Sequence, residues 1–141
     1  MSIVLSDEAR QLAGLFEQET DTTVRDCIVD EEYGRVIVLV KPGEMGKAIG
    51  TDGERVRQVE EQIGKQIKLV EDAPTAEHLV ANALEPAAVY NVTISENEDV
   101  LAYVEVAQAD RGAAIGADGR NIDAARLLAK RHHDIDDVEF A

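Results

Sequence analysis

Tryptophan is absent from this chain of 141 residues, cysteine occurs once, and aromatic residues make up only 4%. The single cysteine, Cys27, can form neither an internal disulfide nor a zinc site by itself. No apolar run approaches the roughly 20 residues that cross a membrane, and the N-terminal sequence MSIVLSDEAR lacks the basic region and apolar stretch of a signal peptide. These absences predict a soluble cytoplasmic protein without membrane association, made of one ordinary domain or two very small ones.

The shortage of aromatic residues and the spacing of the glycines exclude several kinds of site. Five aromatic residues are too few and too dispersed for an RRM or OB fold, which stack bases on aromatic strands. Neither glycine cluster ends in the Gly-Lys-Ser/Thr of a P-loop. His132 and His133 adjoin aspartates, but adjacent side chains diverge and make a poor metal shell. Since no nucleophile–base pair is evident either, we expect no enzymatic activity, no cofactor and no metal.

Positive charge is scarce overall, and it is unevenly distributed. The formal net charge is −15, from 29 acidic and 14 basic residues, whereas a generic nucleic-acid binder would be basic. Residues 1–32 carry nine acids and two bases, and residues 71–99 carry seven acids and no base. Residues 41–68, however, carry six bases against five acids, and residues 110–131 carry five against three. The acidic excess is therefore relieved in two segments, which also hold the glycine motifs described below.

Lysine is the scarcer of the two basic residues, with five against nine arginines. An acid-rich, lysine-poor surface is typical of proteins from a salt-loaded cytoplasm, where a Debye length of about 3 Å at 1 M salt screens self-repulsion. We therefore interpret the chain as halophilic. An ordinary acidic protein is the alternative.

The chain contains an internal repeat with an offset of 66 residues. GKAIGTDGERV at 46–56 and GAAIGADGRNI at 112–122 are identical at six of eleven positions. The same offset aligns two further pairs of segments, which are rich in β-branched residues and separated by turn residues: 24–29 with 90–95, and 35–41 with 101–107. These four segments are expected to be strands.

Helices and a last strand complete each half of the repeat. Ser6 and Thr75 are candidate N-caps of helices that precede the strands. Aliphatic residues at helical spacing follow each glycine pair, and strands are expected at 65–70 and 136–140. Each half therefore has the predicted order α-β-β-α-α-β, which is an α+β fold.

The boundary between the halves is expected near EDAP at 71–74, where a proline follows a strand. This places one domain at residues 1–72 and a second at residues 73–141. Because a domain of about 70 residues is near the lower limit for independent stability, we expect the two to pack together as one unit.

The centre of each repeat is a Gly-x-x-Gly sequence between two expected helices. The two copies are Gly50-Thr51-Asp52-Gly53 and Gly116-Ala117-Asp118-Gly119. Two glycines three apart let the backbone turn sharply and allow a ligand to approach the main chain. The helix that begins after the second glycine attracts anions, which suits a sugar-phosphate backbone. A single Gly-x-x-Gly is also an ordinary helix–helix turn, but its recurrence in matching context favours RNA binding.

These residues resemble the KH signature, in which a Gly-x-x-Gly loop clamps the backbone of about four nucleotides. The order α-β-β-α-α-β resembles the type II variant of prokaryotes, and two copies over residues 5–140 resemble the archaeal NusA-like transcription factors. The resemblance implies a monomer that binds single-stranded RNA in transcription termination or antitermination, with RNA polymerase or the transcription complex as a further partner. It assigns both Gly-x-x-Gly loops to the RNA surface. Bacterial members also carry a polymerase-binding domain and an S1 domain, for which this chain has no room.

Basic side chains near the loops are expected to contribute, because arginine can contact phosphate with two donors. Those expected at the RNA surface are Lys47, Arg55, Arg57 and Arg120, with Arg111 and Arg126 nearby. Many KH loops hold a basic residue between the glycines, whereas both loops here hold aspartate. We expect Asp52 and Asp118 to cap the helices that follow them.

Two other functions stay open at this point. The chain could be a KH protein associated with the ribosome or with RNA processing, or a protein-interaction scaffold that kept the KH fold and lost RNA affinity. RNA binding measured in molar KCl separates the scaffold from the other two functions. Recovery of RNA polymerase or ribosomal subunits with the tagged protein then separates those.

The charge composition predicts that folding depends on salt. An excess of fifteen negative charges repels itself unless it is screened. The helical circular-dichroism signal is expected to fall when salt is dialysed below roughly 0.1 M, where the Debye length is about 10 Å. A melting temperature that is the same in low salt and in several molar KCl would contradict the halophilic interpretation.

Overall fold

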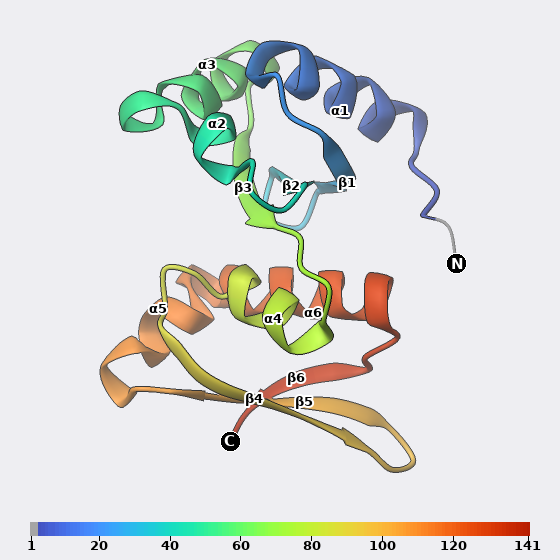
Figure 1. Ribbon diagram of the computed structural model, residues 1–141, viewed down its shortest axis with the longest axis vertical. Helices are drawn as coiled ribbons and strands as arrows, with labels where there is room; N and C mark the ends of the chain where they lie inside the picture. The colour runs from blue at the N-terminus through green and yellow to red at the C-terminus, as the bar shows by residue number, and fades with distance from the viewer. Residues whose placement is uncertain (1–2) are drawn as a thin grey trace. The chain divides into compact units, whose positions relative to one another are not determined.

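The computed structural model describes residues 3–141, and contacts divide the chain into two compact units, Met1–Asp72 and Ala73–Ala141. Each unit is a mixed α+β structure with its own three-stranded sheet (Figure 1). Within the described residues, no helix has the length and apolar character needed to cross a membrane. The packing of the two units as one stays a prediction.

The first unit has the predicted order of helices and strands. Its elements are α1 (Asp7–Thr20), β1 (Val24–Asp30), β2 (Arg35–Val40), α2 (Met45–Ile49), the 3₁₀ turn η1 (Thr51–Gly53), α3 (Glu54–Ile63) and β3 (Gln66–Glu71). The central strand β2 is antiparallel to β1 and parallel to β3. The Ser6 hydroxyl accepts the N–H of Ala9 at 3.1 Å, which confirms the predicted cap of α1.

One hydrophobic core holds the first unit together. Alternate residues of β2 contribute Val36, Val38 and Val40, because side chains two apart lie on one face of a strand. Buried residues of the helices and of β1 complete the cluster: Ala9, Ala13, Phe16, Cys27, Ala48 and Val59. The core therefore fixes α2 and α3, which carry the first Gly-x-x-Gly loop between them, against the sheet.

Several acidic side chains of the first unit bind backbone N–H groups at the ends of strands and in turns. Carboxylates accept backbone N–H groups at 2.7 to 2.9 Å in four pairs: Glu17 with Val24, Glu44 with Thr23, Glu60 with Ile67, and Glu71 with Gly43. Hydrogen bonds to a charged acceptor are stronger than those between neutral groups. Part of the acidic excess is therefore structural and not only a solvated surface.

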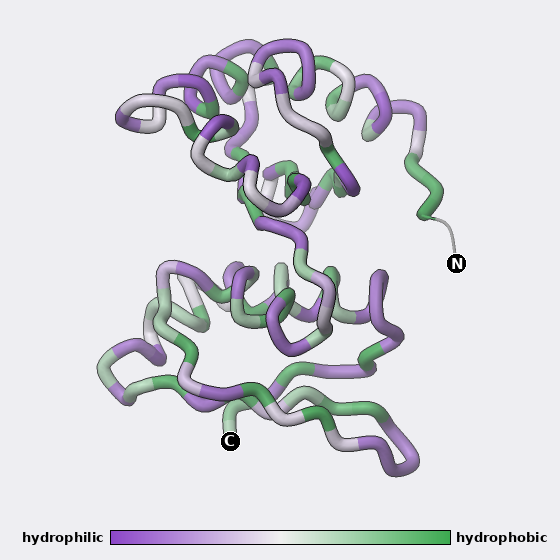
Figure 2. Tube along the Cα trace, viewed as in Figure 1, coloured by the Kyte–Doolittle hydropathy of each residue, from purple (hydrophilic) through white to green (hydrophobic). Residues whose placement is uncertain are grey.

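The second unit repeats the same order with one additional 3₁₀ turn, η2. Its elements are α4 (Ala76–Ala83), β4 (Val89–Glu96), β5 (Val100–Val106), η2 (Gln108–Asp110), α5 (Arg111–Ile115), η3 (Ala117–Gly119), α6 (Arg120–His133) and β6 (Asp137–Phe140). The central strand β5 is antiparallel to β4 and parallel to β6. Thr75 accepts the N–H of His78 at 3.2 Å, as its predicted role as the cap of α4 requires. The tip of the β4–β5 hairpin is hydrophilic (Figure 2).

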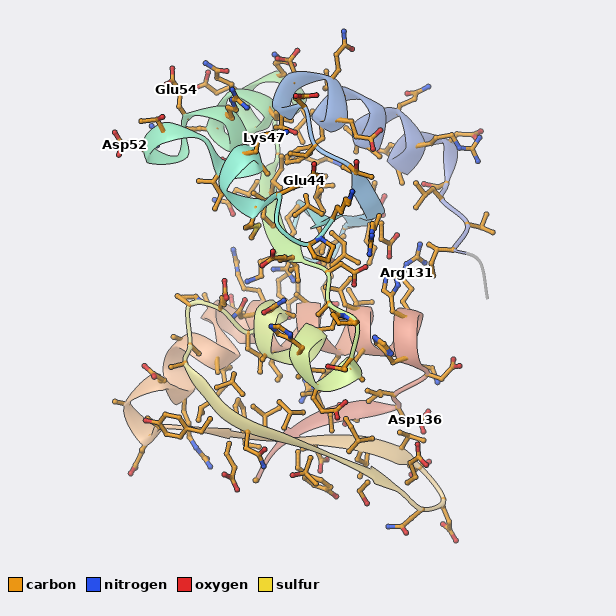
Figure 3. All side chains as sticks on the ribbon, viewed as in Figure 1. Glu44, Lys47, Asp52, Glu54, Arg131 and Asp136 are labelled. Atoms are coloured by element: carbon orange, nitrogen blue, oxygen red, sulfur yellow. The ribbon has the colours of Figure 1, made fainter. Side chains whose placement is uncertain are left out.

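Asp136 joins three elements of the second unit. Asp136 lies one residue before β6 begins. Its carboxylate accepts hydrogen bonds from the N–H of Val100, at the start of β5, at 2.8 Å and from Nζ of Lys130, on α6, at 2.9 Å. The hydrogen bond from Val100, together with that from Lys130, lowers the pKa of Asp136 below its usual value. The same pair raises the pKa of Lys130, chiefly through the hydrogen bond to Asp136. Figure 3 shows Asp136 beside the end of α6.

Replacing Asp136 by asparagine is expected to lower the melting temperature at pH 7. Because folding lowers the pKa of this carboxyl, its ionised form stabilises the fold above the unfolded pKa of about 3.9. That contribution is lost as the pH falls through the lower pKa of the folded state. Melting followed by circular dichroism from pH 7 to pH 2.5 is therefore expected to show wild type and Asp136→Asn converging in acid.

Asp99→Asn removes the same charge from the β4–β5 turn and serves as the matched control. It is expected to change the melting temperature much less at pH 7. A loss of equal size in Asp136→Asn at every pH would contradict the assigned role of the ionised carboxylate.

Candidate nucleic-acid interface

Each Gly-x-x-Gly sequence forms one 3₁₀ turn between two helices, and the two turns share a backbone conformation. The first glycines, Gly50 (φ 75°, ψ −179°) and Gly116 (φ 76°, ψ 170°), lie in a region that is essentially open to glycine alone. The second glycines, Gly53 and Gly119, are left-handed, with φ of 75° and 85°. The predicted sharp turn between helices is confirmed in both units.

The aspartates between the glycines are also left-handed, with φ of 55° for Asp52 and 58° for Asp118. Aspartate is among the few residues other than glycine that adopt this backbone routinely. The prediction that these aspartates are the N-caps of α3 and α6 is wrong, because the cap positions are Gly53 and Gly119. The 3₁₀ turn takes up each aspartate, so the following helix starts one residue later than the sequence suggested.

The first glycine of each loop lies against a side chain of the helix that follows. A Cβ at Gly50 would be 2.7 Å from Cγ of Arg55, and one at Gly116 would be 2.8 Å from Cβ of Asn121. Real Cβ atoms essentially never come this close to another heavy atom. The absence of a side chain at the first glycine therefore serves the packing of the turn as well as access to it.

Three predicted basic residues surround the first loop, and all three are bonded to neighbouring groups. Lys47 Nζ lies 3.7 Å from Oδ2 of Asp21. One terminal nitrogen of Arg55 donates to the carbonyls of Thr20 and Lys47 at 3.3 and 3.4 Å. Arg57 donates to the Asp52 carbonyl at 2.6 Å, so it bonds to the loop itself. In Figure 3, Asp52 lies at the outer end of the loop and Lys47 lies on α2.

The second loop has one predicted basic residue bonded to it. Arg120 donates from Nε to the Ala117 carbonyl at 3.2 Å. Arg111 and Arg126 are instead directed to the C-terminal segment. Arg111 lies over the ring of Phe140, and Arg126 pairs with Asp137 at 2.9 Å. The structure therefore places Lys47, Arg55, Arg57 and Arg120 at the loops, and Arg111 and Arg126 beside β6.

An open concavity of about 420 Å³ lies at the first loop, lined by Gly46, Lys47, Gly50, Thr51 and Arg55. Two of the five residues are basic, and two are glycines that leave the backbone accessible. Backbone of this kind beside positive side chains suits a phosphate-bearing ligand. The role of this loop in binding RNA stays a prediction.

Asn121, on α6 beside the second loop, was not predicted from the sequence. It is 7% exposed, and its Nδ2 donates to the carbonyls of Leu84, Ala113 and Glu85 at 2.9, 3.1 and 3.3 Å. The signal that could have revealed it was the repeat, because an offset of 66 residues aligns Asn121 with Arg55.

Two family models match the chain. One describes a KH domain and matches residues 12–76, and the other describes a NusA-like second KH domain and matches residues 76–139. The crystal structure of APE1850 covers 97% of this chain and the whole of its own, with a TM-score of 0.86 and 33% sequence identity. The fold and the paired loops thus define a protein with two tandem KH domains.

Two relatives from archaea show which kind of KH protein this is. A protein of Halobacterium salinarum is 60% identical over 140 residues, 99% of each chain, and one of Halococcus morrhuae is 55% identical over 141 residues, the full length of both. Both carry the name "Probable transcription termination protein NusA". The chain belongs to the archaeal NusA-like family. The source of these relatives, halophilic archaea, agrees with the halophilic interpretation of the charge.

Replacing Gly50 or Gly116 by alanine is expected to destabilise the protein, by about 1–3 kcal/mol from backbone strain alone. The added Cβ would also collide with Arg55 or Asn121. Chemical denaturation in molar KCl measures the change. Gly14→Ala is the control, because nothing lies within 4 Å of its Cβ position on α1, and it is expected to stabilise by about 0.5–1 kcal/mol. Loop variants as stable as Gly14→Ala would contradict the close approach.

Proposed function

We propose that the chain binds single-stranded RNA through both Gly-x-x-Gly loops and acts in transcription termination or antitermination. The observation that carries this proposal is the repetition of one accessible glycine turn, with the same backbone and flanking helices, in each unit. The names of the relatives support the process, and they suggest the transcription complex or RNA polymerase as a partner.

The RNA surface consists of the two loops and the basic residues beside them. Its members are Gly50, Thr51, Asp52, Gly53, Gly116, Ala117, Asp118, Gly119, Lys47, Arg55, Arg57 and Arg120. The glycines let the sugar-phosphate backbone approach the main chain, and the N-termini of α3 and α6 favour its charge. Each domain, 1–72 and 73–141, provides one clamp for about four nucleotides.

The acidic residues restrict the conditions under which RNA binds. Asp52 and Asp118 lie inside the loops, where they repel phosphate at low salt. At 1 M salt the Debye length of about 3 Å removes most of this repulsion between exposed groups. Binding therefore depends on contacts with the backbone and bases more than on net charge. The protein is proposed to act as a cytoplasmic monomer, by binding and not by catalysis.

Replacing Gly53 or Gly119 by aspartate is expected to remove one clamp each. The variant places a carboxylate where phosphate passes. Aspartate adopts left-handed backbone at Asp52 and Asp118, and at the second glycines it is expected to cost about 1–3 kcal/mol of backbone strain. In molar KCl, each single variant should bind a long single-stranded RNA at least tenfold more weakly, because two linked clamps reach high effective concentration. Fluorescence anisotropy measures the affinity, and circular dichroism checks folding.

The same RNA annealed into a duplex is the control ligand. A clamp that reads exposed base edges in a narrow groove is expected to reject it. Equal affinity for strand and duplex would indicate non-specific attraction. Absence of RNA binding at every salt concentration would instead favour the protein-interaction scaffold. If one variant loses all binding and the other none, only one unit carries an RNA site.

A further inference from the structure

The second residue after each Gly-x-x-Gly sequence bonds back across its loop. Arg55 and Asn121 occupy this position, and the repeat offset relates them. Arg55 donates to the Lys47 carbonyl at 3.4 Å, and Asn121 donates to the Ala113 carbonyl at 3.1 Å. Lys47 and Ala113 are themselves equivalent in the repeat, three residues before the first glycine. Two different side chains thus close the same contact.

Both side chains also reach the end of the helix that opens their unit. Arg55 donates to the carbonyl of Thr20, the last residue of α1, at 3.3 Å. Asn121 donates to the carbonyl of Leu84, the C-cap of α4, at 2.9 Å. Carbonyls at a helix C-terminus have no partner within the helix and carry its negative dipole end, so a donor there is favourable. Each side chain therefore ties together the helices on both sides of the loop and the helix that opens the unit.

From these contacts we propose that Arg55 and Asn121 are positioning residues, which hold the two glycine turns in the shape that RNA meets. Asn121 is neutral and buried, so it acts without touching the ligand. Arg55 is also a member of the proposed RNA surface. It contributes to binding through its hydrogen bonds to the carbonyls of Thr20 and Lys47 more than through an attraction between its charge and phosphate. The proposal rests on the proposed RNA binding, and it explains the first glycines, whose missing Cβ leaves room for these two side chains.

The contacts of Asn121 and those of Arg55 are expected to differ in strength. This difference can be measured by amide exchange in the absence of RNA. Asn121 is buried and bonds at 2.9 to 3.3 Å, whereas Arg55 is exposed and bonds at 3.3 and 3.4 Å. The turn bonds follow the same order: the N–H of Gly119 lies 3.1 Å from its acceptor and that of Gly53 lies 3.3 Å from its acceptor. Amide exchange of Gly119 is expected to be slower than that of Gly53, and Asn121→Ala should remove this difference.

RNA affinity tests the positioning role through its salt dependence. Asn121→Ala and Arg55→Ala should each weaken binding about five- to tenfold, the equivalent of one or two lost hydrogen bonds. The slope of log affinity against log salt should stay that of wild type in both. A lost phosphate contact, by contrast, reduces the slope by about 0.7 for a single strand, which is the result expected for Lys47→Ala.

Arg55→Asn distinguishes the contact from the charge at this position. It removes the same charge as alanine but restores the side chain that the second unit uses, so it should bind RNA more tightly than Arg55→Ala. Arg10→Ala on α1 and Asn97→Ala in the β4–β5 turn are matched controls for charge and for amide loss. Melting curves accompany every variant.

Three results would overturn the proposal. They are wild-type affinity in Asn121→Ala, a reduced salt slope in Arg55→Ala, and equal affinities in Arg55→Asn and Arg55→Ala. Should Asn121→Ala unfold, the two Arg55 variants decide, because Arg55 is exposed and its removal empties no core. Failure of wild type to bind RNA at all would contradict the proposed function instead, and the exchange rates of Gly53 and Gly119 would still test the contacts.

Discussion

The close approach between the first glycine of each loop and the side chain that follows the second is the constraint on which both units depend. A Cβ at Gly50 would lie 2.7 Å from Arg55 and one at Gly116 would lie 2.8 Å from Asn121, so no other residue fits without displacing its neighbour. The approach fixes a backbone that only glycine adopts readily, and that backbone makes the turn between the helices sharp. An accessible main chain at the turn is therefore a consequence of how the turn is packed. RNA binding and stability therefore both require glycine at the first position of each loop.

The acidic composition has a related double use. Carboxylates of the first unit hold the ends of strands and turns by accepting backbone N–H groups, and Asp136 does the same at the start of β5. Other acids, including those inside the loops, face solvent and suit a surrounding solution of high salt. Acidic residues oppose the binding of nucleic acid at low salt. Some of the same residues stabilise the strands and turns of the units that carry the loops. The relatives from Halobacterium salinarum and Halococcus morrhuae, which are halophilic archaea, agree with this interpretation of the charge.

The sequence was sufficient for the order of elements and for the loops. β-branched segments, Ser6 and Thr75 as caps, and the 66-residue repeat predicted strands and helices that the structure confirms, because periodicity and capping report local backbone and burial. The contacts of Asn121 and of the carboxylates were not predictable from periodicity or capping, since they join residues 7 to 37 positions apart. The caps at α3 and α6 were misassigned for a similar reason: a left-handed aspartate in a 3₁₀ turn and an aspartate cap give the same residue pattern. Only φ and ψ distinguish them.

The central claim, that both glycine turns contact one RNA strand, is tested most directly by photo-crosslinking. A single-stranded RNA of some twenty nucleotides is irradiated with the protein in molar KCl, and the attached peptides are identified by mass spectrometry. The account predicts crosslinks in both segments 46–57 and 112–120 on the same RNA population. Crosslinks confined to the β4–β5 hairpin, or absent from both segments while RNA is bound, would contradict it.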